Sequence, residues 1–100
     1  MEQSTGRGAP AGSATPNSFS ATVAEEMGNL LVRRPLDPDE DFFLSGGDSL
    51  RAVELIARLA GRFQPDDPGK SEQLHAALLL AVFDDPTPIW LGEVIGQHVQ

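Results

Sequence analysis

A serine that follows two glycines and an aspartate is the residue of this chain best placed to do chemistry. Ser49 stands at the start of a periodic helical segment, directly after Gly46, Gly47 and Asp48. A serine on the first turn of a helix lies at the solvent edge of a domain, where an external enzyme reaches it. The free N–H groups of that turn and the positive end of the helix dipole favour an attached negative charge by about 0.3–1 kcal/mol. The first turn of this helix would therefore favour an anionic group if one were attached to Ser49.

The chain offers Ser49 no activating partner of its own. His75 and His98 are distant from Ser49 in sequence, and neither has an acidic residue at a spacing that would orient it. There is no cysteine, which excludes a disulfide framework, a thiolate zinc site and a cysteine nucleophile. We therefore expect no catalytic residue and no metal site. The sequence predicts a non-enzymatic protein that another enzyme modifies, with any working sulfur supplied from outside.

Four helices are expected to position this serine. Hydrophobic periodicity and turn residues place them at 19–32, 49–63, 71–83 and 88–99. The first has two possible N-caps, Ser20 and Thr22, and the fourth is expected to begin with Thr87 as cap and Pro88 in its first turn. No strand alternation is present. The predicted fold class is all-α, a four-helix bundle around one core with a long loop between the first and second helices.

The periodicity also predicts which faces are buried. The second helix is expected to have a polar stripe formed by Arg51, Glu54, Arg58 and Arg62. Its apolar side is expected to be formed by Val53, Ile56, Leu59, Ala60 and Phe63. The third helix is apolar enough from Leu74 onward to be expected largely buried. In the fourth helix we expect Leu91, Val94 and Ile95 to face inward and Trp90 to be a half-buried anchor or part of a docking surface.

The predicted loop over residues 36–48 is strongly acidic. It holds five acids and no basic residue, namely Asp37, Asp39, Glu40, Asp41 and Asp48. Phe42 and Phe43 are expected to anchor it to the helices, and the paired glycines predict a turn with unusual backbone angles. Such a loop is expected to attract basic partners.

Composition limits the classes of partner. The 100 residues contain 15 acidic and 7 basic side chains, a formal net charge of −8. That balance argues against nucleic-acid binding, which needs a basic face. Residues 1–17 are expected to be a disordered lead and 18–100 the domain. The sequence has neither a signal-peptide core nor the ~20 apolar residues that span a bilayer, so we expect a cytoplasmic monomer that contacts no membrane.

The run from Phe42 to Leu50, Phe-Phe-Leu-Ser-Gly-Gly-Asp-Ser-Leu, resembles the attachment site of acyl and peptidyl carrier proteins, the phosphopantetheine-binding thiolation domains. The order of elements from Phe19 to Val99 is also similar to that family. The paired glycines favour the peptidyl subclass. The sequence departs from the family at positions 44 and 45, where an acid and a leucine are usual. The stretch after the second helix is about ten residues longer than in the family, which predicts an extended, partner-specific third helix.

The resemblance implies a covalent 4′-phosphopantetheine, derived from coenzyme A, on Ser49, with Asp48 and Gly47 beside it. A phosphopantetheinyl transferase with magnesium would attach it, an adenylation enzyme would load its thiol, and condensation or tailoring enzymes would use the resulting thioester. The implied function is that of a peptidyl or aryl carrier in nonribosomal peptide or hybrid natural-product biosynthesis, including antibiotics. Its expected docking residues are Leu50, Arg51, Val53 and Glu54.

Several alternatives stay open at this point. The chain is expected to be a stand-alone carrier, although an excised domain would look the same. It is also compatible with an acyl carrier protein of a polyketide or fatty-acid system, or with a cofactor-free α-helical interaction module in which Asp48 and Ser49 are only a helix cap. The run from Gly47 to Leu50 spells the nucleophile motif of GDSL esterases. Those resemble α/β sandwiches with an Asp-x-x-His pair, which this sequence lacks.

Overall fold

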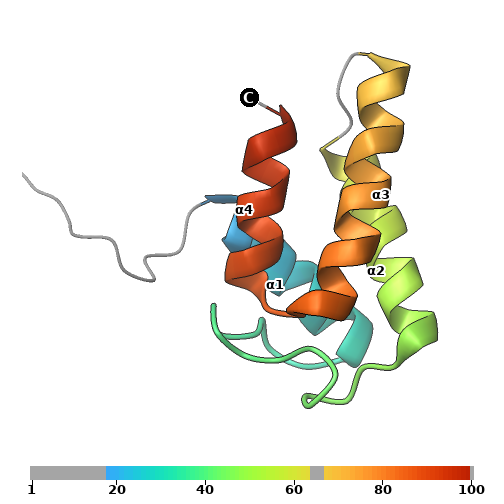
Figure 1. Cartoon of the computed structure of the whole chain (residues 1–100). Coiled ribbons are helices and arrows are strands. Elements are labelled where there is room, and N and C mark those ends of the chain that lie inside the picture. The colour runs from blue at the N-terminus through green and yellow to red at the C-terminus, as the bar shows by residue number, and fades with distance from the viewer. Residues whose placement is uncertain (1–17, 64–66, 100) are drawn as a thin grey trace, which may run out of the picture.

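The described residues, 18–63 and 67–99 of a computed structural model, form four helices and no strand (Figure 1). These are α1 (Ser18–Leu31), α2 (Ser49–Arg62), α3 (Pro68–Asp84) and α4 (Pro88–Val99). The predicted all-α four-helix fold is confirmed. The lead predicted for residues 1–17 lies outside the described residues.

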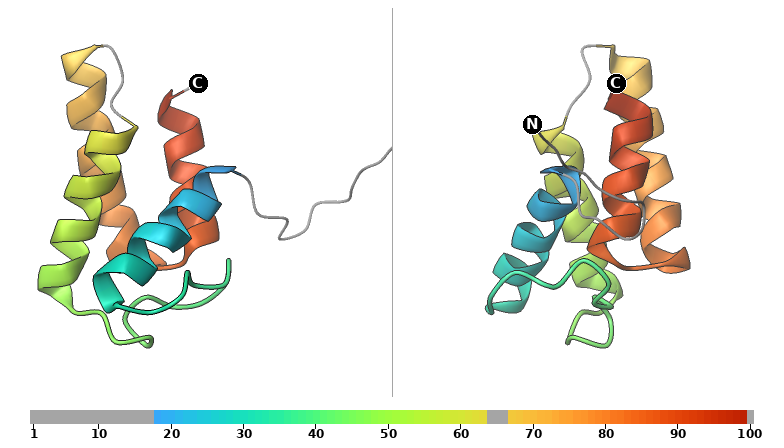
Figure 2. Two further views of the ribbon diagram at one scale, coloured as in Figure 1. Left: turned by 180° about the vertical axis from the view of Figure 1, so that it is seen from behind. Right: turned by 90° about the vertical axis from the view of Figure 1, so that its left-hand side faces the viewer.

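The helices pack as a ring in which α1 contacts α4 and α2, and α3 contacts α4 and α2. The long connection from α1 to α2 crosses one end of the bundle, where α2 begins and α3 passes into α4 (Figures 1 and 2). Side chains from all four helices and from this connection form one apolar core, which includes Met27, Phe42, Leu55, Leu78 and Ile95. Within the described residues no helix is both long and apolar enough to cross a membrane.

Helix α1 begins at Ser18, so the prediction that Ser20 or Thr22 caps it is wrong. Ser20 is instead buried at the contact with α4. A β-carbon on Gly92 of α4 would lie 2.7 Å from the backbone nitrogen of Ser20, closer than two nonbonded atoms approach. The small residues Ser20 and Gly92 thus allow the two helix backbones to lie close together.

Helix α1 ends in a Schellman motif with an unusual residue. The N–H of Arg33 donates to the Gly28 carbonyl at 2.9 Å, and the N–H of Val32 donates to the Asn29 carbonyl at 3.4 Å. This motif requires a left-handed backbone at Val32, whose φ is 57°. Glycine or asparagine normally occupies that position, because a β-branched side chain there is strained.

Helix α2 spans the predicted residues to within one position, with Phe63 as its C-cap. Its buried side chains are Ala52, Leu55, Ile56 and Leu59. The prediction that Val53 faces inward is wrong, since 49% of it is exposed. The buried stripe follows an i, i+3, i+4, i+7 spacing from Ala52, which leaves Val53 at the edge of the face.

A buried carboxylate joins α2 to α1. Glu26 of α1 accepts a hydrogen bond from Arg62 Nη1 at 2.8 Å and lies 3.5 Å from Arg58 Nη1. Breaking a pair in which one partner is buried leaves an uncompensated charge. This ion pair therefore contributes to holding α2 against α1.

Helix α3 begins at Pro68, three residues before the predicted start. Asp67 is its N-cap, accepting from the Gly69 N–H at 2.8 Å, and Pro68 suits the first helical position because it needs no N–H partner there. The expectation that α3 is largely buried is also wrong. Leu80 is 75% exposed and more than half of Phe83 is exposed. The outer face of α3 is thus apolar and uncovered in this chain.

Helix α4 occupies the predicted span. The Trp90 N–H donates to Thr87 Oγ1 at 3.4 Å, as expected for a cap, and Leu91, Val94 and Ile95 are buried as predicted.

Candidate functional site

Ser49 is the first residue of α2 and is exposed at the end of the bundle. Asp48 is the N-cap, as predicted. Its Oδ1 accepts from the Arg51 N–H at 2.8 Å, and its Oδ2 accepts from Arg51 Nη1 at 3.0 Å. The Asp48 carboxylate thus both caps the helix and forms an ion pair with Arg51.

The first turn of α2 suits an attached phosphate group. In the described part of the chain, the backbone N–H groups of Ser49 and Leu50 have no hydrogen-bond acceptor. N–H groups of this kind, at the positive end of a helix, favour an anion. An exposed hydroxyl beside them fits a phosphodiester, so the site is compatible with phosphopantetheine on Ser49.

The two glycines before the site have different roles. Gly46 has φ of 118°, in the region that disfavours residues with a β-carbon. Gly47 lies against the ring of Phe42, and a β-carbon on Gly47 would be 2.4 Å from Phe42 Cε2. The predicted turn with unusual backbone angles is confirmed at Gly46, whereas Gly47 is required by close packing.

Phe42 anchors the segment before Ser49, as predicted. Its side chain is fully buried, and its N–H donates to the Pro86 carbonyl at 2.9 Å, at the junction of α3 and α4. The Gly47 N–H in turn donates to the Phe42 carbonyl at 2.9 Å. The turn that leads to Ser49 is therefore fixed to a distant part of the chain.

Phe43 is the second anchor. Its ring contacts Phe42 edge to face at 5.8 Å and stacks on Phe83 of α3 at 5.8 Å, with 20° between the planes. The loop over residues 36–48, called the attachment loop below, is thus joined to the end of α3 by an aromatic contact.

The acids of the loop are less free to meet a basic partner than predicted. Arg33 donates two hydrogen bonds to the Glu40 carboxylate, and these hold the pKa of Glu40 at about 2, below its ordinary 4.5. Asp37 lies 3.5 Å from Arg34 Nη1. With Asp48 paired to Arg51, three of the five acids are neutralised by arginines that flank the loop in sequence, and this pairing was missed.

Three apolar side chains close to Ser49 in sequence are exposed. Leu44 and Leu50 are 88% and 80% exposed, and Val53 follows one turn along α2. Leu44 stands where the family usually has an acid, so the departure at position 44 places a leucine on the surface.

The described residues around Ser49 include no acid–base pair that would activate it. His75 is exposed on α3, and His98 Nδ1 lies 3.0 Å from the Val94 carbonyl on its own helix. No group of three or more histidine or acidic side chains within the described chain could hold a metal ion. The serine also follows a loop and not a strand, which contradicts the esterase alternative.

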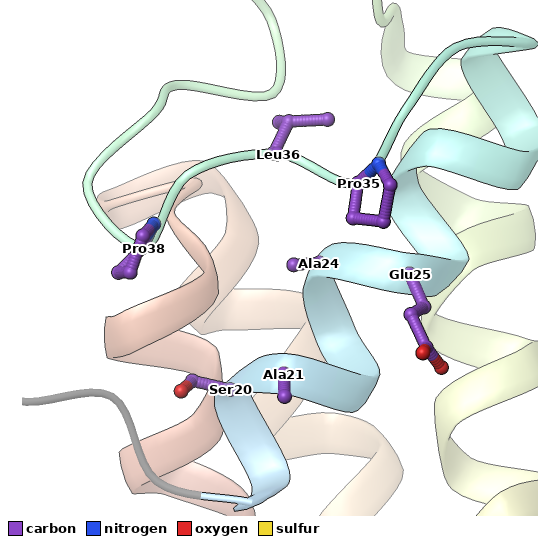
Figure 3. A pocket seen from close by; sticks show the side chains of 7 residues that line it. All are labelled: Ser20, Ala21, Ala24, Glu25, Pro35, Leu36 and Pro38. Carbon is purple, nitrogen blue, oxygen red and sulfur yellow. The ribbon is translucent and has the colours of Figure 1, made fainter.

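An apolar pocket of about 330 Å³ lies away from the serine, between α1 and the start of the loop (Figure 3). Ala21 and Ala24 line it from α1, and Pro35 and Pro38 line it from the loop. Ser49 does not line this pocket. Trp90 is half-buried against the core, and its indole N–H is buried with no hydrogen-bond partner among the described residues.

Comparisons with known proteins match the part of the chain that contains Ser49. The model of a family described as a phosphopantetheine attachment site matches residues 19–67. Phenyloxazoline synthase MbtB of Mycolicibacterium paratuberculosis (strain ATCC BAA-968 / K-10) is 31% identical over 84 residues, which cover 77% of this chain and 7% of that protein. Malpinin synthetase of Mortierella alpina is 31% identical over 85 residues, covering 85% of this chain and 1% of that protein. The chain therefore spans only a small part of these relatives. No solved structure gives a significant match.

Proposed function

Because this chain contains a carrier domain of the phosphopantetheine attachment-site family, which carries 4′-phosphopantetheine covalently, we propose that Ser49 is its attachment residue and that the chain carries aminoacyl or aryl groups in nonribosomal peptide or hybrid biosynthesis. The observation that carries the proposal is the position of Ser49, an exposed hydroxyl at the free N-terminus of α2 within the matched residues. The arm, when bound, supplies the thiol on which an acyl group is held.

The attachment step needs a second protein. Ser49 Oγ forms a phosphoester bond, the bond between the two linked phosphates of coenzyme A breaks, and 3′,5′-adenosine bisphosphate leaves. The serine proton passes to a base of the transferase, because His75 and His98 make no contact with Ser49 in the described structure. The contribution of this chain is to expose the hydroxyl and to place the new phosphate at the N–H groups of Ser49 and Leu50.

The partner enzymes are proposed to dock on the surface around Ser49. Leu50 and Val53 supply exposed apolar area, while Arg51 and Glu54 are ion-paired to Asp48 and Arg58 within the chain. Side chains that become fully desolvated in a packed interface carry most of its binding energy, and exposed ion pairs contribute little. Leu50 and Val53 are therefore expected to matter more than Arg51 and Glu54.

The outer face of α3 extends this surface. Leu80 and Phe83 are exposed, and Phe83 is tied to the attachment loop through Phe43. We assign partner choice to this face, so that adenylation, condensation and tailoring enzymes are distinguished by what they contact there. The transferase contacts the part of the surface that is nearer to Ser49.

Incubation of the full chain with coenzyme A, magnesium and a promiscuous phosphopantetheinyl transferase tests the attachment residue. Intact-mass spectrometry is expected to show the gain of one phosphopantetheine, lost in Ser49→Ala and retained in the matched control Ser71→Ala, a serine on α3. A chain that gains no mass, or a Ser49→Ala chain that still gains it, would refute the proposal.

The docking surface is tested with two substitutions at one position. Leu50→Gln is expected to slow the transferase reaction, whereas Leu50→Met keeps the apolar contact and the wild-type rate. Because Leu50 is exposed, neither change should lower the melting temperature appreciably. Equal rates for the two variants would contradict the assigned surface.

The class of cargo is tested by thiol-mediated release of the group carried by the chain purified from its native cells. An amino or aryl acid supports the peptidyl carrier, and a malonyl or alkyl group would support an acyl carrier instead. The mass of the native polypeptide in the same preparation tests the expectation that the carrier stands alone.

A further inference from the structure

One carboxylate in the middle of the α1–α2 connection is bonded to three other residues of that connection. Each oxygen of Glu40 accepts two hydrogen bonds. Oε2 accepts from Arg33 Nη1 at 2.8 Å and from Ser45 Oγ at 3.2 Å, and Oε1 accepts from Arg33 Nη2 at 3.2 Å and from the Asp37 N–H at 3.0 Å. Four donors on one partly buried carboxylate make an extensive local network.

The network begins at a fixed point. Arg33 follows α1 directly, and its backbone N–H is bonded to the Gly28 carbonyl. Its guanidinium also donates from Nε to the Arg34 carbonyl at 3.2 Å. Glu40 is therefore attached to the end of a helix, and not only to neighbouring loop residues.

The other end of the network lies at residues 45–47, the turn that precedes Ser49, which we call the attachment turn. Ser45 donates its hydroxyl to Glu40 and its N–H to the Asp41 carbonyl, and it precedes Gly46 and Gly47. Phe42 fixes this turn to the α3–α4 junction, whereas Glu40 fixes it to α1. A turn held at only one of these points would be free to pivot about it. The two anchors together hold the turn that precedes Ser49 at two points.

We propose that Glu40 is a positioning residue for the modification of Ser49, acting through Ser45 and Arg33. The proposal rests on the function proposed above. The Glu40–Ser45 bond holds the attachment turn in the orientation that the transferase needs, so the reacting hydroxyl is preorganised before the enzyme binds. A displacement of about 1 Å at a reacting group lowers a rate by up to about a hundredfold.

Ser45 supplies the only side-chain hydroxyl among the four donors to Glu40 within the described residues. Ser45 stands where a leucine is usual in the family, and leucine has no hydroxyl to donate. The departure at position 45 thus replaces an apolar side chain with a polar bond to Glu40. The low pKa of Glu40, caused first by its hydrogen bonds to Arg33, keeps this acceptor ionised throughout the neutral range.

The test measures transferase kinetics on full-length variants. Glu40→Gln and Ser45→Ala are expected to lower kcat about tenfold, with KM within about twofold of wild type because the exposed surface of α2 is unchanged. Ser45→Thr keeps the hydroxyl and is expected to restore the rate. The double variant should be no slower than Glu40→Gln alone, because both residues act through one bond.

Glu26→Gln is the matched control for lost stability. Glu26 is also a carboxylate bound to arginine, but it is buried and its ion pairs join α1 to α2. The Glu26→Gln substitution should lower the melting temperature and leave kcat unchanged when all chains are assayed well below their melting temperatures. Ser45→Ala at the wild-type rate, or an equal loss of kcat in Glu26→Gln, would overturn the proposal.

Hydrogen exchange gives a readout that does not depend on the transferase. In Glu40→Gln, the amides of Ser45, Gly46 and Gly47 are expected to exchange faster while those in the middle of α2 keep their protection. Unchanged exchange in the turn would contradict the role of Glu40. An unmodified wild-type chain would instead refute the proposed function, so the two failures are distinct.

Discussion

Val32 holds a backbone conformation that glycine would adopt without strain, and replacing it is expected to stabilise the fold. Its φ is 57°, and 90% of the residue is exposed, so the side chain contributes little burial. The left-handed region costs a residue with a β-carbon about 1–2 kcal/mol. Glycine removes this cost, but it gives the unfolded chain additional freedom worth about 0.4–1 kcal/mol.

The difference predicts that Val32→Gly raises the free energy of unfolding by about 0.5–1 kcal/mol. For a domain of this size, that corresponds to a rise in melting temperature of about 2–8 °C. Thermal denaturation followed by circular dichroism at 222 nm measures it. Urea denaturation gives the free energy independently, with an unchanged m-value if only the native strain is relieved.

The matched control introduces glycine where the backbone is helical. Ala57 is exposed on α2, and Ala57→Gly is expected to destabilise the chain by about 0.5–1 kcal/mol. A loss of stability in Ala57→Gly together with a gain in Val32→Gly would show that backbone conformation decides whether glycine stabilises the chain. A Val32→Gly chain that melts at or below the wild-type temperature would refute the reasoning.

Three further changes test the packing and charge described above. Gly47→Ala places a β-carbon against the Phe42 ring and is expected to destabilise the chain by about 1–3 kcal/mol, measured by urea denaturation; a neutral effect would contradict the close packing. Gly61→Ala adds a β-carbon in open space on α2 and should stabilise the chain by about 0.5–1 kcal/mol in the same assay, and a loss of stability would count against the helical geometry there. Because the pKa of Glu40 is about 2 when folded and ordinarily 4.5, its contribution to stability is complete above pH 4.5 and disappears as the pH falls through 2. Glu40→Gln should therefore flatten the pH dependence of the melting temperature over that interval, and an unchanged slope would refute the assignment.

The backbone geometry around Ser49 was predictable because the residues that form it are local in sequence. Asp48 caps α2, Gly46 has the positive φ and Phe42 is buried, and each follows from residue type and spacing. The partners of the two phenylalanines were not predictable, because they are remote in sequence. Phe42 donates to the Pro86 carbonyl, and Phe43 stacks on Phe83.

Helix α3 shows where periodicity fails. A segment that is apolar on all sides does not indicate which face is covered, so Leu80 and Phe83 were expected inside and lie outside. Its early start was missed because Asp67, Pro68 and Gly69 were interpreted as loop residues. The same Asp-Pro pair is also a helix start, and only the tertiary fold decides between them.

The pairing of the loop acids needed the structure for a different reason. Arg33 and Arg34 precede the loop in sequence, and the chain reverses after Val32 and brings them to Glu40 and Asp37. The number of acidic residues in the loop therefore overstates the negative charge that the loop presents to a partner.

The stack of Phe43 on Phe83 makes the attachment loop and α3 a single unit for protein engineering. A chimera that transplants residues 40–48 into another carrier separates Phe43 from its partner ring and Phe42 from the Pro86 carbonyl. Exchange of this site between carriers must therefore move the end of α3 and its junction with α4 together with the loop, and must also keep Arg33 at the end of α1, which donates to Glu40.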